Sequence, residues 1–299
     1  MEADPLYHVK QLFYQACISE ATSQGITPSS DPEPLHRALY VARSHLALSP
    51  ASSSSAQAVL APFLSLSTPP LSAKAVSLFS EYLSQRSEDK IEEIRDLVLE
   101  CEGGEDEDEE RVVRVVAASI FILEKEVEEA VATLTEGVAK TDLECNALLV
   151  QLSLSLDRRD LAQTTYANAK KTGNDSTLVQ VMEAWIGLKT GSRPLHQAYY
   201  FYEELYQLPS GRTLPVLASH AAAHLLLGHV DEAQADITEG LQKEGGDKDG
   251  DILAVGVTLG LEGYTAKLSA AAPSHPLALD LAEKSRAFDE AAAKFSVAA

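Results

Sequence analysis

The segment Ala130–Gly137, with the sequence AVATLTEG, has an alanine followed four residues later by a large apolar residue and three further on by a small one. A similar arrangement, with a small or apolar residue in the last place, occurs three more times in the second half of the chain. These copies are Ala162–Tyr166–Ala169, Ala198–Tyr202–Leu205 and Ala233–Ile237–Gly240. Successive alanines lie 32, 36 and 35 residues apart, which indicates one structural unit repeated along the chain.

A period of about 34 residues is typical of tetratricopeptide (TPR) helix pairs. The alanine is small because two helices cross closely there, and the later apolar residue fills the gap to the next pair. We therefore predict an all-α fold, a TPR-like α-solenoid in which antiparallel helix pairs form a superhelix with a C-terminal capping helix. The predicted pairs are 111–124 with 126–139, 143–156 with 158–171, 176–190 with 194–208, and 213–227 with 230–243.

The predicted domain organisation is a single solenoid over residues 1–299, divided by turn-rich breaks and one acidic run. The run at 102–110 reads EGGEDEDEE and predicts an exposed loop, because like charges repel and two glycines loosen the backbone. The predicted parts are irregular N-terminal helix pairs at 1–101, the acidic loop at 102–110, regular repeats at 111–244, and C-terminal helices with a cap at 251–299. Outside the repeats, helices are expected near 6–21, 35–48, 57–66, 72–85, 91–101, 251–267 and 276–295.

The charge balance excludes several classes of partner. The 299 residues include 24 Lys and Arg against 45 Asp and Glu, a net charge of −21. Nucleic-acid binding requires a basic surface, and a chain with this excess of acidic residues shows no basic stripe. The same negative charge disfavours docking on anionic lipid. Cys17, Cys101 and Cys145 are far apart and fit no disulfide framework or zinc pattern. Without a signal peptide or a membrane-spanning apolar run, we expect a cytoplasmic protein with no direct membrane insertion.

The register of the repeat predicts a partner-binding groove, because the first helix of each TPR pair lines the concave surface. Most of the predicted lining is apolar, and such a groove left open to water promotes aggregation. We therefore expect a permanent protein partner, with Trp185 either as an aromatic anchor or as part of the core. The predicted groove residues are Val115, Ser119, Ile122, Ala147, Gln151, Leu154, Leu178, Val181, Trp185, Leu188, Ala218, Ala222 and Leu225.

Patterns for catalysis or metal binding are weak. His220 and His224 have the spacing of zinc ligands on one helix, but the sequence offers no evident third ligand. The run 247–251 has alternating aspartates and lacks the glycine and glutamate that an EF-hand loop requires. No nucleophile elbow, phosphate loop or dinucleotide fingerprint occurs. We therefore expect no enzyme activity, no catalytic residue, no cofactor and no metal.

Several short stretches are distinctive when taken together. They are Val9–Tyr14, Cys17–Ala21, Ala117–Ile120 (AASI), Leu143–Ala147 (LECNA), Gln151–Leu152, Leu156–Ala162 (LDRRDLA), Ala184–Gly191 (AWIGLKTG), Gln197–Glu204 (QAYYFYEE), and Ser274–Pro276 with Phe288–Asp289. In these stretches the chain resembles the epsilon subunit family of the coatomer (COPI) vesicle coat. The resemblance is strongest over 117–288 and weak across 28–70 and the acidic run, and a glycine turn usual near the start is absent.

This resemblance implies a non-enzymatic structural subunit of the coat. Its expected partners are the C-terminal domain of the coatomer alpha subunit, bound as a stable heterodimer through the concave groove and contributing an extended β-hairpin, and other coatomer subunits. The expected role is retrograde Golgi-to-endoplasmic-reticulum and intra-Golgi vesicle transport. The expected location is cytoplasmic and peripheral, on Golgi membranes and COPI-coated vesicles. The alternative is a TPR scaffold or adaptor of another cytosolic multiprotein assembly.

Two further classes fit the sequence less well. A chaperone-binding TPR adaptor clamps a terminal carboxylate with basic groove residues, because an anion needs charged donors. The predicted groove positions contain no Lys or Arg. An enzyme on a helical scaffold would have a polar pocket with acid groups of shifted pKa, and the sequence shows no motif for one.

Overall fold

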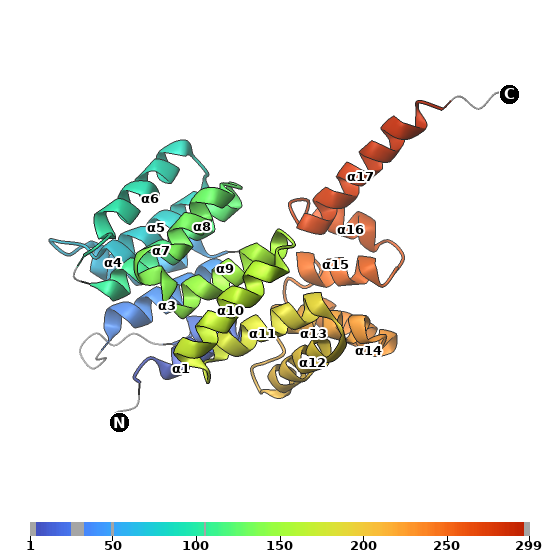
Figure 1. Cartoon of the computed structure of the whole chain (residues 1–299), viewed down its shortest axis with the longest axis horizontal. Coiled ribbons are helices and arrows are strands. Elements are labelled where there is room, and N and C mark those ends of the chain that lie inside the picture. Colours follow the sequence, from blue (N-terminus) through green and yellow to red (C-terminus); the bar gives the residue numbers. More distant parts are fainter. Residues whose placement is uncertain (1–3, 25–32, 49–50, 105, 296–299) are drawn as a thin grey trace. The chain divides into compact units, whose positions relative to one another are not determined.

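All regular elements of the part that the structure covers are helical (Figure 1). The structure, a computed structural model, describes residues 4–24, 33–48, 51–104 and 106–295. Neighbouring helices pack in a repeating arrangement, which confirms the predicted α-solenoid. None of the helices in these ranges is long and apolar enough to cross a bilayer. The chain divides into two compact units, residues 1–201 (unit 1) and 202–299 (unit 2). That the two units form one continuous solenoid stays a prediction.

Unit 1 contains an irregular N-terminal part followed by regular helix pairs. The N-terminal part consists of α1 (Tyr7–Tyr14), α2 (Ile18–Thr22), α3 (Pro34–Ala47), α4 (Ser53–Leu64), α5 (Leu71–Ser84) and α6 (Glu88–Cys101). The pairs consist of α7 (Glu107–Leu123) with α8 (Val127–Thr135) and a short 3₁₀ helix η1 (Gly137–Lys140), α9 (Leu143–Ser155) with α10 (Arg159–Gly173), and α11 (Thr177–Thr190) with the start of α12 (Ser192–Gln207). The pair boundaries agree closely with those predicted from the repeat.

The repeat alanines lie where helices cross, as their size predicted. Ala130, Ala162, Ala198 and Ala233 are at most 1% exposed. The residues at the matching crossing position of each first helix are also buried; they are Ala118, Val150, Ala184 and Ala221. A Cβ added at Gly187 of α11 would lie 2.5 Å from the carbonyl oxygen of Pro194 in α12, so the two backbones almost touch. Larger side chains at these positions would force the helix pairs apart.

The acidic run is not entirely a loop, which corrects the prediction for 102–110. Helix α7 begins at Glu107, four residues before the predicted start. Asp106 caps this helix by accepting hydrogen bonds from the backbone N–H groups of Asp108 and Glu109. Carboxylates in a first turn are stabilised by the positive end of the helix dipole, which offsets their mutual repulsion. Glu110, expected to be exposed, is buried and pairs with the buried Arg114 at 2.7 Å.

The N-terminal segment 6–21 is two helices, whereas its apolar spacing predicted one. The backbone at Ala16 is left-handed, with φ of 58°, and this conformation ends the first helix. The N–H of Cys17 then donates to the carbonyl of Leu12 at 2.9 Å and closes the turn. The break leaves α1 as a short separate helix whose polar side chains contact the regular pairs.

Unit 2 contains the C-terminal residues of α12, followed by α13 (Leu214–Leu227), α14 (Val230–Leu241), α15 (Gly250–Thr258), α16 (Tyr264–Ala271) and α17 (Pro276–Ala292). Its core lies between α13, α14 and α15 around Leu217, Ala221, Ile237 and Ile252. The stretch 251–267, predicted as one helix, is interrupted because Gly260 and Gly263 have φ of 74° and 79°.

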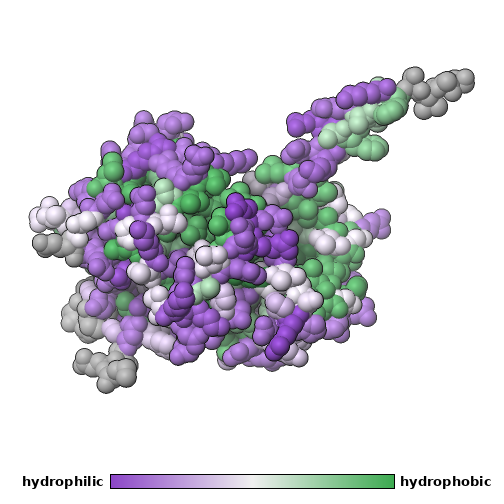
Figure 2. All heavy atoms as spheres, in the orientation of Figure 1, coloured by the Kyte–Doolittle hydropathy of each residue, from purple (hydrophilic) through white to green (hydrophobic). Residues whose placement is uncertain are grey.

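The last helix, α17, follows α16 as the sequence predicted, but few of its residues are covered. Only Ala278 is buried on it, and Leu279 and Phe288 are 51% and 72% exposed. Figure 2 shows hydrophobic residues along part of this helix. As a cap on its own unit, α17 packs against α16, and its Ala278 joins a small apolar cluster with Leu253 and Leu268.

Candidate functional site

Unit 1 contains a cavity of about 720 Å³ with a partly polar lining, which we call the N-terminal cavity. Helices α1 and α3 form one side of it, and the N-terminal ends of α7, α9 and α11 form the other. These ends belong to the first helices of the three pairs, which were predicted to line the concave face. The chain's own N-terminal helices therefore cover one edge of the predicted groove.

A single carboxylate connects the two sides of this cavity. Glu144, at the start of α9, accepts hydrogen bonds from the hydroxyls of Tyr14 at 2.6 Å and Tyr40 at 2.7 Å. Its other oxygen accepts from the Arg43 guanidinium at 2.6 Å. Burial alone would raise the pKa of the Glu144 carboxyl, but the charge of Arg43 and the three hydrogen bonds hold it below its usual range. Glu144 is therefore ionised and fully partnered at neutral pH.

Further contacts fix the N-terminal helices in place. The guanidinium of Arg43 lies 4.8 Å from the ring centre of Phe13, a cation–π contact. The two tyrosine hydroxyls lie 2.8 Å apart and share one oxygen of the carboxylate as their acceptor. On α11, the Thr177 hydroxyl donates to the side chain of Gln11 at 2.6 Å. Helix α1 is thus attached to both α9 and α11 by buried polar contacts.

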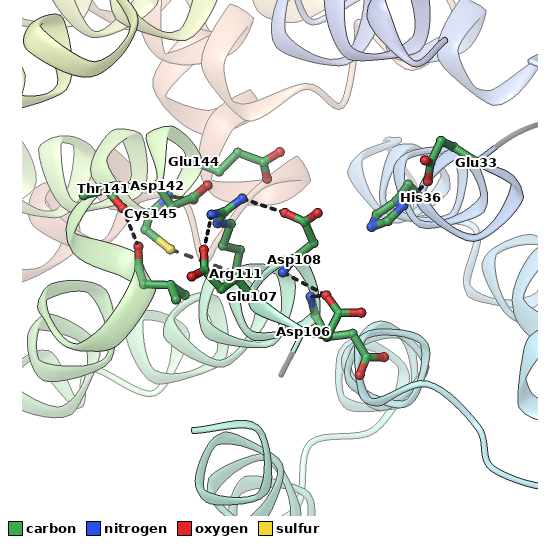
Figure 3. A network of polar contacts seen from close by, with 12 residues as sticks. Glu33, His36, Asp106, Glu107, Asp108, Arg111, Thr141, Asp142, Glu144 and Cys145 are labelled. Atoms are coloured by element: carbon green, nitrogen blue, oxygen red, sulfur yellow. Dashed lines mark hydrogen bonds and ion pairs between the residues drawn. The ribbon is translucent and has the colours of Figure 1, made fainter. Parts of the chain in front are cut away.

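The charged groups at the start of α7 are also paired with one another (Figure 3). Arg111 bonds Asp108 at 2.6 Å and Glu107 at 2.8 Å, one turn earlier in the same helix. Asp142 caps α9 by accepting from the N–H of Cys145 at 2.8 Å. Burial and the nearby charge of Glu144 raise the pKa of the Asp142 carboxyl. Arg111 and the two aspartate caps therefore stabilise the ends of these helices.

The arrangement is suited to holding helices together. Cys145 is the thiol nearest to these acids, and burial raises the pKa of its Sγ well above the usual range, which suppresses the nucleophilic thiolate. The Glu144 carboxylate is already saturated with donors, so it is a poor proton acceptor for a substrate. The N-terminal cavity therefore functions as a polar joint between helices.

Comparison with protein families decides the class of the chain. A family model described as the coatomer epsilon subunit matches residues 2–296. The chain belongs to the coatomer epsilon subunit family. As a member, it is a subunit of the coatomer coat of vesicle transport and associates with other coatomer subunits.

Relatives from plants and animals match the coatomer epsilon chain over almost its whole length. Coatomer subunit epsilon-1 of Arabidopsis thaliana is 25% identical over 302 residues, covering 98% of each chain. Coatomer subunit epsilon-1 of Oryza sativa subsp. japonica is 26% identical and covers 92% of each chain. Coatomer subunit epsilon of Caenorhabditis elegans is 23% identical over 97% of this chain and 98% of its own.

The predicted groove residues of this chain fall into three groups within unit 1. Val115 and Leu178 lie in the N-terminal halves of their helices and line the N-terminal cavity. Ala147, Leu154 and Val181 are buried among neighbouring helices. The more accessible positions are Ser119, Ile122, Gln151, Trp185 and Leu188, of which Gln151 is exposed and the others half-buried. Apart from Ala147, Val181 and the cavity residues, the predicted positions lie toward the C-terminal halves of α7, α9 and α11.

In unit 2, Ala218 is buried in the core, and Ala222 and Leu225 are half-buried on α13. Trp185 is half-buried and packs partly against the apolar cluster around Val150 and Met182. Both roles predicted for it, an anchor for a partner and a part of the core, agree with this position. No partner chain is present, and binding at these positions stays a prediction.

Sequence reasoning missed the N-terminal residues that complete the cavity. Tyr14, Tyr40 and Arg43 lie more than 100 residues away from Glu144 in the sequence. No short motif connects them to α9. The available signal was Glu144 itself, a charged residue near the start of a predicted first helix that is otherwise mostly apolar.

Proposed function

We propose that this chain binds the C-terminal domain of the coatomer alpha subunit as a stable heterodimer. In this role it supports retrograde Golgi-to-endoplasmic-reticulum and intra-Golgi vesicle transport on the cytosolic face of Golgi membranes. The family match over residues 2–296 carries the proposal. A coat subunit needs a partner in the coat, and the solenoid offers a ready concave surface for one.

The half-exposed residues of the first helices narrow the proposed contact. Ile122 on α7 and Trp185 and Leu188 on α11 are neither fully buried nor fully exposed. Apolar and aromatic side chains of this kind contribute most to binding when a partner completes their burial. The start of the same helices is already covered by α1 and α3. The proposed partner segment therefore lies along the C-terminal halves of α7, α9 and α11.

Replacing Trp185 with alanine tests the contact. We expect the Trp185→Ala variant to bind the alpha C-terminal domain more weakly by about 2 kcal/mol, roughly 30-fold in Kd. Leu188→Ala should weaken binding in the same direction. Binding is measured by titration calorimetry at low and high salt, and high salt should leave it largely intact because the contact is apolar.

Leu161→Ala is the matched control, because Leu161 is an exposed leucine on α10 outside the predicted groove. Circular dichroism shows whether each variant keeps its helix content. If folded Trp185→Ala and Leu188→Ala bind as tightly as Leu161→Ala, the groove assignment is wrong. If the unchanged chain does not bind the alpha domain at all, the proposed partner is wrong, and a scaffold role in another assembly becomes the better reading.

A further inference from the structure

A cluster of histidines and carboxylates lies in unit 2, on α12, α13 and α14. His220 and His224 occupy successive turns of α13, and their ring centres lie 4.4 Å apart. Glu203, near the end of α12, lies with its Oε2 2.9 Å from Nε2 of His220. The sequence offered two histidines without a third ligand, and the fold supplies that ligand from another helix.

We propose that Glu203, His220 and His224 form a binding site for a divalent transition-metal ion, with Zn²⁺ as the best fit. One ligand atom from each of the three residues lies within 4.8 Å of the others. In a tetrahedral zinc site with bonds of about 2.0–2.1 Å, ligand atoms are about 3.3 Å apart. Oε2 of Glu203 lies 2.9 Å from Nε2 of His220, so this pair is already close to that separation, and the Glu203 side chain is half-exposed.

The surroundings of His220 match those of a zinc ligand. Its second nitrogen, Nδ1, lies 3.0 Å from Oδ2 of the buried Asp236 on α14. Metal-bound histidines usually present the other ring nitrogen to a carboxylate, which fixes the orientation of the ring and increases its basicity. The ring of Tyr206 stacks on His220 with centres 4.9 Å apart, which further restrains it. Asp236 and Tyr206 are thus positioned as supporting residues around a preformed ligand.

The charge balance also favours a dication. The His220 ring lies between two carboxylates, Glu203 and Asp236. A Zn²⁺ ion would balance the two negative charges of these carboxylates. Nitrogen and oxygen donors from histidine and glutamate suit zinc, whereas Mg²⁺ and Ca²⁺ prefer oxygen ligands alone.

The site is reachable from solvent on one side. The Glu203 side chain is 34% exposed, and His229, whose Nδ1 lies 3.4 Å from Nδ1 of His224, is exposed on the chain between α13 and α14. A bound ion would link the end of α12 to α13 and, through Asp236, to α14. It would therefore stabilise the folded form of unit 2, because the unfolded chain has no preformed ligand set.

The test is titration of the full-length chain, made without a histidine tag and stripped with a chelator, with Zn²⁺ alone in a calorimeter. We expect one ion per chain, a raised melting temperature with zinc, and the visible absorption of tetrahedral cobalt when Co²⁺ is used instead. Glu203→Gln and His224→Gln should each bind zinc at least tenfold more weakly. His8→Gln, which removes an exposed histidine on α1, is the matched control and should bind like the unchanged chain.

Circular dichroism of each apo variant separates a lost ligand from a lost fold. Glu203→Gln is decisive in this respect, because the substitution is nearly isosteric and lies on a half-exposed side chain. Absence of one-to-one binding to the unchanged chain overturns the proposal. Zinc binding by folded Glu203→Gln at the strength of His8→Gln also overturns it. These outcomes do not depend on whether the alpha subunit binds.

Discussion

Each unit contains a buried polar cluster, and the two clusters differ in how their charges are matched. In unit 1 the Glu144 carboxylate has one cation, Arg43, and the hydroxyls of two tyrosines as donors. In unit 2 the His220 ring lies between two carboxylates, Glu203 and Asp236. The first cluster has one stable charge state, because arginine does not lose its proton. The second changes state with pH or with a bound cation, since histidine does. A carboxylate whose charge is fully balanced by an arginine holds helices in one arrangement. Two carboxylates around one histidine carry negative charge that a bound cation can balance.

The largest expected effect comes from breaking the unit 1 cluster. Arg43→Ala leaves the Glu144 carboxylate buried without its cation, which we expect to lower the free energy of unfolding by about 3 kcal/mol. Urea denaturation followed by the fluorescence of Trp185, the single tryptophan and a residue of unit 1, measures this loss.

The double variant Arg43→Met with Glu144→Met serves as the control. It removes both charges, so it should be more stable than Arg43→Ala despite carrying two changes. The tyrosine hydroxyls still have each other as partners in this variant. If Arg43→Ala is as stable as the unchanged chain, the Glu144 cluster does not hold the N-terminal helices to α9 as we describe.

The contrast between the clusters also explains how far the sequence could predict the structure. The helix pairs from α7 to α14 were predictable because a crossing alanine and the residues that pack on it are close in sequence; Ala130 with Leu134 and Ala233 with Ile237 are examples. The contact of Tyr14 with Glu144 was not predictable, since it depends on how a non-repeating N-terminal segment folds back onto the repeats. Glu203 was missed as a third metal ligand for the same reason, because it lies on a different helix from the histidines.

The acidic run shows a local failure of another kind. Repulsion among like charges predicted a loop, but three local contacts outweigh it. Asp106 caps the helix, Arg111 neutralises two of the acids, and Arg114 neutralises Glu110. Each of these partners was within reach of sequence reasoning, at helix spacings of three or four residues.

A pH series tests the second cluster in the absence of metal. Burial alone would lower the pKa of His220, but Asp236 and Glu203 raise it above its usual value of about 6.5. The folded chain thus keeps a proton that the unfolded chain loses, and this stabilisation is lost as the pH rises from 6.5 through the folded pKa. Burial and the charge of His220 lower the pKa of His224, so His224 destabilises the fold as the pH falls below 6.5. We expect the stability of unit 2 to be greatest near pH 6.5.

His224→Gln separates the two contributions. The variant should lose the decline in stability on the acid side of pH 6.5 and keep the decline on the alkaline side, which comes from His220. Urea denaturation followed by circular dichroism between pH 5.5 and 8, with His8→Gln as control, measures both limbs. Equal pH profiles for the two variants would contradict the assignment of the acid limb to His224.

The smallest expected loss of stability is for the helix caps. Comparing one cap in each unit tests whether the two units differ outside their buried clusters. Asp106 caps α7 in unit 1 and Asp249 caps α15 in unit 2, each accepting backbone hydrogen bonds. Burial raises the pKa of the Asp249 carboxyl, because it disfavours the charged form. Replacement of either aspartate with alanine should lower the free energy of unfolding by about 0.5–1 kcal/mol at neutral pH, measured by urea denaturation. Similar losses of unfolding free energy at the two caps would mean that the units differ only in the clusters around Glu144 and His220. A loss for Asp106→Ala as large as that for Arg43→Ala would mean that Asp106 belongs to the unit 1 cluster.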